Sequence, residues 1–179
     1  GQLPHPRQQD PATTTSNPGM PIKGAVFDMD YNVEGSDVGY RWYAREGLTP
    51  LFPFGHGLSY TSFAYSNLQA YHQDGTLVVT VMVHNTGARA GAAVPQIYIS
   101  RDGSNGFAPR LGGFERIDLQ PGEIRQVKIH VDPRLLARFD AGRRMWVMEP
   151  GIVNVRCSES ATAQGKSVDV ELPAFLNAG

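Results

Sequence analysis

Short runs of β-branched and other apolar residues recur along the chain from Phe63 to about Leu172. They read LVVTVMVHN, VPQIYIS, RQVKIHV, MWVMEPGIVNVRCS and SVDVEL. In the first run, alternate residues fall on one face of an extended strand: Leu77, Val79, Val81 and Val83. The intervening residues fall on the other face: Val78, Thr80, Met82 and His84. A period of two predicts strands that are half covered by a second sheet.

Turn signals separate these runs. TGARAG and QPGE lie between runs and EPG interrupts MWVMEPGIVNVRCS, and the pairs Pro121-Gly122 and Pro150-Gly151 predict tight turns. About seven runs at a spacing of roughly ten residues predict a mainly β fold. We expect a two-sheet antiparallel sandwich with immunoglobulin-like or fibronectin type III-like topology.

One segment of this region, DPRLLARFD, favours a short helix of one or two turns. Asp132 is a suitable cap, and Pro133 fits the first turn. Three apolar residues would then share one side of the helix: Leu135, Leu136 and Phe139.

Composition limits the possible functions. The chain has 179 residues and a formal net charge of −1, so its charge gives no reason to expect nucleic-acid or membrane binding. Cys157 is the single cysteine, which excludes an internal disulfide and a metal site built on cysteine pairs. No run of about 18 apolar residues is present. Residues 1–20 are rich in proline, glutamine and threonine, and this composition predicts a polar linker or loop.

No catalytic constellation is visible in the sequence. Asp28, Asp30 and Glu34 could form an acid/base pair or a cation site, but FDMDYNVEG lacks the EF-hand offsets, which favours polar groups at a strand end. The histidines have no metal-ligand spacing, and neither a serine-hydrolase elbow nor a phosphate loop occurs. We therefore expect no metal and no cofactor.

The aromatic residues permit two hypotheses. A carbohydrate-binding module would use flat rings on which sugars stack, and four residues could serve: Tyr40, Trp42, Tyr43 and Trp146. The stretch PLFPFGHGLSYTSF instead places apolar side chains on backbone that its prolines and glycines keep out of a helix. We favour a sealed interdomain joint for these residues: Phe52, Phe54, His56, Leu58 and Tyr60.

The segment YNVEGSDVGYRWYAREGLTPLFPFGHGLSYTSFAYSNL, from Tyr31 to Leu68, resembles a defined part of the family 3 glycoside hydrolases of the β-glucosidase type. In that family it leads from the α/β sandwich domain into a fibronectin type III-like domain. Downstream, VHNTGARAGAAVPQIYIS, PRLGGFERIDLQPGE and WVMEPGIVNV resemble the strands of the latter domain, although Cys157 replaces a usual glycine. The resemblance covers roughly residues 21–172.

This resemblance implies three parts of the chain. Residues 1–20 are the polar linker or loop, residues 21–62 are the end of the α/β sandwich domain with the interdomain joint, and residues 63–179 are the fibronectin type III-like sandwich. It also implies the C-terminal portion of a retaining β-glucosidase that hydrolyses terminal non-reducing β-D-glucosyl residues. The catalytic Asp and Glu would lie on an upstream partner, a TIM barrel plus α/β sandwich, so no catalytic residue is expected here.

Some residues could still reach the substrate from this side. Tyr31, Glu34, Arg41 and Trp42 lie nearest the implied α/β domain and are candidates for the rim of the active site, although an internal Arg–Glu salt bridge is the simpler expectation. The alternatives are a non-catalytic carbohydrate-binding module, a purely structural sandwich, and the same role in a β-xylosidase. The family also suggests a periplasmic or secreted enzyme.

Overall fold

The computed structural model describes residues 37–73, 75–102 and 107–177. The chain divides into two compact units, residues 1–52 and 53–179, which are considered separately here. In the first unit the described element is the helix α1, Tyr40–Arg45, which follows Gly39 at φ 63°. The second unit begins inside the proline-glycine stretch, ten residues before its first strand at Phe63.

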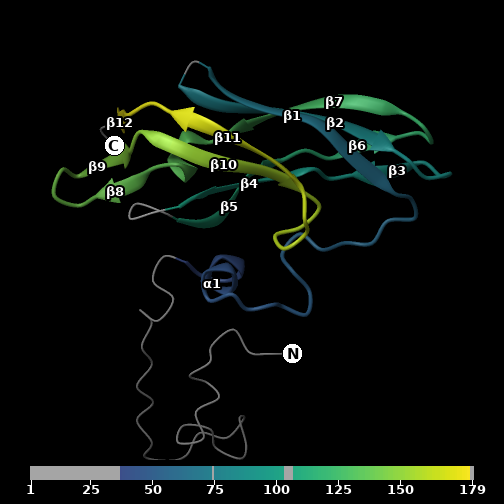
Figure 1. Cartoon of the computed structure of the whole chain (residues 1–179), viewed down its shortest axis with the longest axis horizontal. Helices are drawn as coiled ribbons and strands as arrows, with labels where there is room; N and C mark the ends of the chain where they lie inside the picture. Colours follow the sequence, from purple (N-terminus) through teal and green to yellow (C-terminus); the bar gives the residue numbers. More distant parts are fainter. Residues whose placement is uncertain (1–36, 74, 103–106, 178–179) are drawn as a thin grey trace, which may run out of the picture. The chain divides into compact units, whose positions relative to one another are not determined.

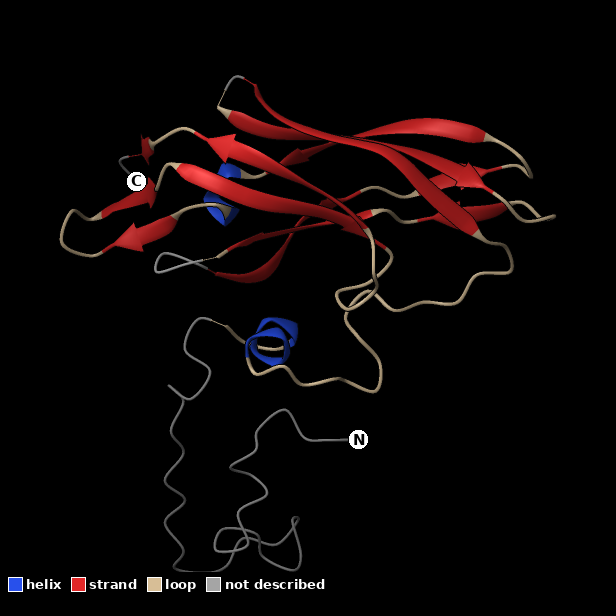
Figure 2. Cartoon of the chain, in the orientation of Figure 1, coloured by secondary structure: helices blue, strands red, loops and turns tan. Residues whose placement is uncertain are grey.

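The second unit is built almost entirely of strands (Figure 2). In chain order they are β1 Phe63–Gln73, β2 Thr76–Asn85, β3 Gly91–Ala93, β4 Gln96–Arg101, β5 Phe107–Phe114, β6 Ile117–Leu119, β7 Ile124–Val131, β8 Arg138–Asp140, β9 Met145–Met148, β10 Gly151–Ser158, β11 Lys166–Leu172 and β12 Phe175–Asn177. A 3-10 turn, η2, covers Pro133–Leu135.

Two antiparallel sheets form the body of this unit (Figure 1). One has the strand order β1-β2-β7, and the other has the order β11-β10-β4-β5. β1 contacts β11 and β5 contacts β7, so the two sheets approach each other along both long edges. Three strands packed on four, in this order, confirm the predicted fibronectin type III-like sandwich.

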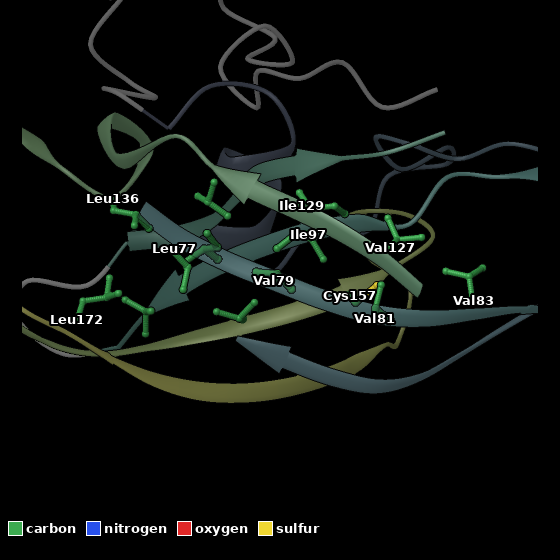
Figure 3. Close-up of a cluster of buried hydrophobic side chains, with 14 of the residues drawn as sticks. Leu77, Val79, Val81, Val83, Ile97, Val127, Ile129, Leu136, Cys157 and Leu172 are labelled. Atoms are coloured by element: carbon green, nitrogen blue, oxygen red, sulfur yellow. The ribbon is translucent and has the colours of Figure 1, made fainter. Parts of the chain in front are cut away.

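The core lies between the two sheets (Figure 3). The predicted inner face of β2 is almost fully buried: Leu77, Val79, Val81 and Val83. The facing sheet contributes Ile97, Val153, Val155 and Cys157. The alternation predicted that these residues share one face, and the structure shows that this face is the core side.

The outer face of β2 is more buried than its alternation predicts. Val78 is 1% exposed and Thr80 is 8% exposed. The register places Val78 between Tyr71 and His130 of the two flanking strands. Because β2 is the central strand, long side chains from both neighbours can lie over its outer face.

The loops follow their sequence signals closely at one turn. The amide of Glu123 donates to the carbonyl of Gln120 at 3.0 Å, and Gly122 has φ 74°. This is the geometry of a type II turn, with Pro121 at its second position and glycine where φ is positive. The predicted Pro-Gly turn is therefore confirmed.

The helix predicted in DPRLLARFD is reduced to η2. The Asp132 carboxylate accepts a hydrogen bond from the Arg134 amide at 2.9 Å, and Pro133 occupies the first turn, as expected. The prediction that Phe139 lies on this helix is wrong, because Phe139 belongs to β8. Only Leu136 of the predicted apolar side is buried in the core.

A small third sheet, β12-β9-β8, accompanies the sandwich, together with the pair β3-β6. The apolar run MWVMEPGIVNVRCS is split between two sheets: β9 pairs with β8 and β12, whereas β10 joins the sandwich. Gly151, at φ 135°, is the first residue of β10. We call β12-β9-β8 the satellite sheet.

Candidate functional site

The joint segment, residues 53–62, is tied to the sandwich through its main chain. The carbonyl of Phe54 accepts a hydrogen bond from the amide of Ala161 at 2.9 Å. The carbonyl of Gly55 accepts one from the Nε2 of Gln96 at 3.2 Å. The amide of His56 donates to the carbonyl of Pro53 at 2.9 Å, which closes a turn within the segment. The path of this loop is therefore determined by hydrogen bonds to β4 and to the β10–β11 loop.

Gln96 is the centre of this attachment. Its side chain is buried, with 6% exposed. Its Nε2 also donates to the carbonyl of Glu159 at 2.6 Å, and its Oε1 accepts from the hydroxyl of Tyr98 at 2.6 Å. All the donors and acceptors named here are paired, as a stable buried polar network requires.

Gly55 is required by two independent features of this contact. Its φ of 79° is a conformation that residues with a side chain rarely adopt. A Cβ at this position would lie 2.1 Å from the Oε1 of Gln96. Glycine here lets the joint segment approach the Gln96 amide closely.

Arg156 extends the network from β10. Its guanidinium donates to the carbonyls of Ala161 and Ala163, each at 2.6 Å, and lies 5.3 Å from the centre of the Tyr98 ring. Ala161 is the residue whose amide bonds to Phe54. The loop that receives the joint segment is therefore itself fixed by a charged side chain.

Asn85 anchors the far end of the segment. Its side chain is fully buried; the Oδ1 accepts from the hydroxyl of Thr61 at 2.7 Å, and the Nδ2 donates to the carbonyl of Leu119 at 3.1 Å. A Cβ on Gly87 would lie 2.2 Å from the Thr61 hydroxyl oxygen. These contacts give a physical reason for the Asn-Thr-Gly sequence at the end of β2.

The side chains of the stretch point to solvent, in contrast to its main chain. Phe54 is 49% exposed, Leu58 is 95% exposed and Tyr60 is 91% exposed. In the first unit, Phe52 is 72% exposed. Exposed apolar side chains on a fixed backbone are typical of a surface that receives a partner. That these residues seal an interdomain joint stays a prediction.

Two of the four rim candidates lie in the described part of the chain, both on α1. The Nη2 of Arg41 lies 2.5 Å from the Oδ1 of Asp37, an i,i+4 ion pair. Trp42 is buried and makes an edge-on contact with Tyr43, with ring centres 5.8 Å apart. Asp37 was not predicted as the partner of Arg41, although the spacing of four residues is a signal for it.

The remaining carboxylate and rim candidates lie outside the described residues: Asp28, Asp30, Tyr31 and Glu34. The segments 1–20 and 21–36 lie outside them as well, so those parts of the predicted domain division stay predictions. Among the described residues, 37–73, 75–102 and 107–177, no three His, Cys, Asp or Glu side chains gather as a metal site would require. None of the helices in the described part has the length and hydrophobicity needed to cross a membrane.

The titratable groups with shifted pKa values have structural explanations. Burial in the core raises the pKa of the Cys157 thiol to about 12. The Gln120 amide and then the Arg125 guanidinium lower the pKa of Glu123 by hydrogen bonding to its carboxylate. The Arg134 side chain lowers the pKa of Asp132 in the same way. A neutral buried thiol and two turn carboxylates do not form a catalytic pair.

Comparison with known proteins agrees with this architecture. Residues 93–161 match the family described as the fibronectin type III-like domain. The chain is 42% identical over 120 residues to β-glucosidase BoGH3A of Bacteroides ovatus, covering 64% of this chain and 16% of that protein. It is 40% identical over 148 residues to thermostable β-glucosidase B of Acetivibrio thermocellus, covering 79% of this chain and 20% of that protein.

Solved structures give the same result. DesR, a β-glucosidase from Streptomyces venezuelae solved with D-glucose, superposes with a TM-score of 0.73 at 38% identity, covering 78% of this chain and 18% of that one. β-Glucosidase 3B from Thermotoga neapolitana, solved with α-D-glucose, superposes with a TM-score of 0.74 at 34% identity. The match covers 81% of this chain and 21% of that one. The chain thus spans about a fifth of the length of these relatives. It contains a fibronectin type III-like domain and is homologous to one part of the β-glucosidases.

Proposed function

We propose that the chain is the C-terminal portion of a retaining β-glucosidase that hydrolyses terminal non-reducing β-D-glucosyl residues. The observation that carries the proposal is its similarity to β-glucosidases of which it spans only 16–20% of the length. The catalytic Asp and Glu would then belong to the upstream part of the enzyme. Within this chain no residue is assigned to either role.

The role of this portion would be to hold a preformed apolar surface against the upstream catalytic part. The main chain of the joint segment is fixed by Gln96 and Ala161, whereas Leu58 and Tyr60 point outward with more than nine tenths of their surface exposed. A surface whose backbone is already ordered loses little entropy when it binds, which favours a stable interface. A purely structural contribution to the whole enzyme is compatible with this role.

Reconstitution tests the proposal. The upstream part of the same enzyme would be produced alone or together with this chain, and hydrolysis of p-nitrophenyl β-D-glucoside and β-D-xyloside would be measured. We expect full activity only when both parts are present, with preference for the glucoside. A preference for the xyloside would assign the enzyme to the β-xylosidases instead. Full activity and unchanged thermal stability of the upstream part alone would contradict the proposed role.

A matched pair of variants locates the interface. Leu58→Asp places a charge on the exposed joint side chain, and Ile152→Asp makes the same change on β10, where the side chain is 64% exposed. A charge buried without a partner is strongly unfavourable. We expect Leu58→Asp to weaken reconstitution at least tenfold and Ile152→Asp to leave it within twofold. Equal effects would show that the joint segment is not the contact.

We also propose that the enzyme acts in the periplasm or outside the cell. This rests on the family resemblance of the sequence alone. Fractionation of the native cells, with β-glucosidase activity assayed in each fraction, tests it. Activity confined to the cytoplasmic fraction would contradict it.

A further inference from the structure

An aromatic pair stands on the outer face of the satellite sheet. Phe139 of β8 and Trp146 of β9 are directly opposite each other in the antiparallel register. Their ring centres are 5.6 Å apart and their planes meet at 67°. Phe139 is 52% exposed and Trp146 is 38% exposed, whereas the next residue, Val147, is only 7% exposed. The sheet therefore turns Val147 inward and presents the two rings to solvent.

The sandwich core does not use this pair. Neither ring belongs to the core cluster between the sheets of the sandwich. A tryptophan contributes most to stability when its large apolar surface is removed from water, so a half-exposed position beside a second exposed ring is a poor use of it. Paired rings left in solvent are better explained by a ligand.

Polar groups lie in the hairpin turn that joins β8 and β9. The Oδ1 of Asp140, the residue after Phe139, accepts a hydrogen bond from the amide of Arg143 at 3.0 Å. The Nε of Arg143 lies 3.9 Å from the Oδ2 of the same carboxylate. Arg144 has φ 53°, an uncommon conformation for a residue with a side chain, in the turn between the two strands. Because side chains alternate along a strand, Asp140 belongs to the face opposite Phe139, and the two rings alone form the exposed aromatic surface.

We propose that Phe139 and Trp146 form a binding platform for a β-linked glucan chain. The ring faces carry partial negative charge and attract the C–H groups that line one face of a pyranose. The exposed area of the two rings is on the order of 200 Å², far below the roughly 800 Å² that each partner contributes to a stable protein interface. The choice of a glucan, rather than another sugar polymer, rests on the proposed function.

The angle between the two rings indicates which form of glucan fits the platform. Two rings at 67° form a corner and not a flat strip. One pyranose can lie on one ring face while its edge meets the second ring, whereas a flat crystalline surface can touch only one ring at a time. The platform therefore suits single soluble chains, such as mixed-linkage β-glucan or laminarin, in preference to crystalline cellulose.

Affinity electrophoresis of the chain in gels containing barley β-glucan or laminarin tests the proposal. We expect retardation in these gels but not in gels containing dextran, an α-linked glucan. Trp146→Ala and Phe139→Ala should raise the apparent Kd at least tenfold and at least threefold, respectively. Phe114→Ala removes a ring that is 60% exposed on β5 and should leave the Kd within twofold. Circular dichroism would verify that each variant is folded.

A second measurement needs no variant. Trp42 is 4% exposed, so acrylamide quenching reports mainly on Trp146. Bound glucan should lower the quenching constant at least twofold. Unretarded migration of the unaltered chain, or no protection from acrylamide, would overturn the proposal. So would a dimer in sedimentation velocity that Trp146→Ala dissociates, since the pair would then contact a second copy.

The test of glucan binding can be distinguished from the test of the proposed β-glucosidase role. Trp146→Ala should leave hydrolysis of a small aryl glucoside by the reconstituted enzyme unchanged, because such a substrate is too short to reach a second site. Loss of glucan binding with intact hydrolysis supports the platform. Glucan binding without any reconstituted hydrolysis would preserve the platform and contradict only the proposed β-glucosidase role.

Discussion

Replacement of Gln96 by alanine should destabilise the chain more than any single change on its surface. The substitution removes two donated hydrogen bonds, to the carbonyls of Gly55 and Glu159, and the acceptor of the Tyr98 hydroxyl. Each buried hydrogen bond contributes about 1 kcal/mol, and a buried group left without a partner costs about 1–3 kcal/mol. Because the Tyr98 side chain is fully buried, its hydroxyl cannot turn to bulk water.

We therefore expect Gln96→Ala to lower the free energy of unfolding by about 3 kcal/mol, which for a domain of this size corresponds to about 10 °C in Tm. Urea denaturation followed by circular dichroism measures the change. Gln126→Ala is the matched control, because Gln126 is exposed on β7. A loss below about 0.5 kcal/mol, or one equal to that of the control, would refute the assignment of Gln96 as the centre of the attachment.

The attachment also has a local consequence that a general loss of stability would not reproduce. Without Gln96 the carbonyl of Gly55 loses its partner from the sandwich, although the Phe54 carbonyl keeps its bond to Ala161. The joint segment should open more often than the strands unfold. Limited proteolysis under native conditions should cleave Gln96→Ala within residues 53–62 at least tenfold faster, with the sandwich left intact.

Three further outcomes follow from the structure. Asn85→Ala should cost about 3 kcal/mol in urea denaturation, because it leaves the buried carbonyl of Leu119 and the half-buried hydroxyl of Thr61 without their partner amide. Cys157, whose pKa is raised to about 12 by burial, should not react with a thiol reagent at pH 8 until denaturant is added. The lowered pKa of Glu123 means that its stabilising contribution is present above the unfolded-state pKa and is lost as the pH falls through the folded value. In an NMR titration, Arg125→Ala should return the pKa of Glu123 only part of the way to its ordinary value, because the larger effect comes from the amide of Gln120.

The sandwich could be predicted from the sequence because its strands alternate strictly and its turns carry Pro-Gly signals. The burial of Leu77 and Val79 follows from a period of two, and the Pro121-Gly122 turn follows from the φ that proline fixes and glycine permits. These signals are local, so a single sequence contains them. A local signal also explains the wrong prediction for Phe139. Its spacing fits a helix, but pairing with Trp146 on the next strand determines its conformation.

The attachment of the joint segment could not be predicted in the same way. Gln96 lies 41 residues from Gly55 and 63 residues from Glu159 in the sequence. No local pattern indicates which polar residue of a strand will be buried and bonded to a distant loop. Gln96 stands in the motif that resembles the β-glucosidases, but the motif alone assigns it no role. Asn85 gives a partial exception, because Asn-Thr-Gly after a strand predicts a turn and so indicates a side chain bonded to main chain.

The joint segment separates its two tasks between main chain and side chains. Its main-chain bonds to Gln96 and Ala161 are satisfied within the second unit, so they need no partner. Its side chains at Leu58 and Tyr60 contribute almost nothing to that unit, because they remain exposed. Changes in the first group should therefore alter the stability of this chain on its own, whereas changes in the second should alter only its association with another part. A surface built in this way is ordered before its partner arrives, which is the property that an interdomain joint needs.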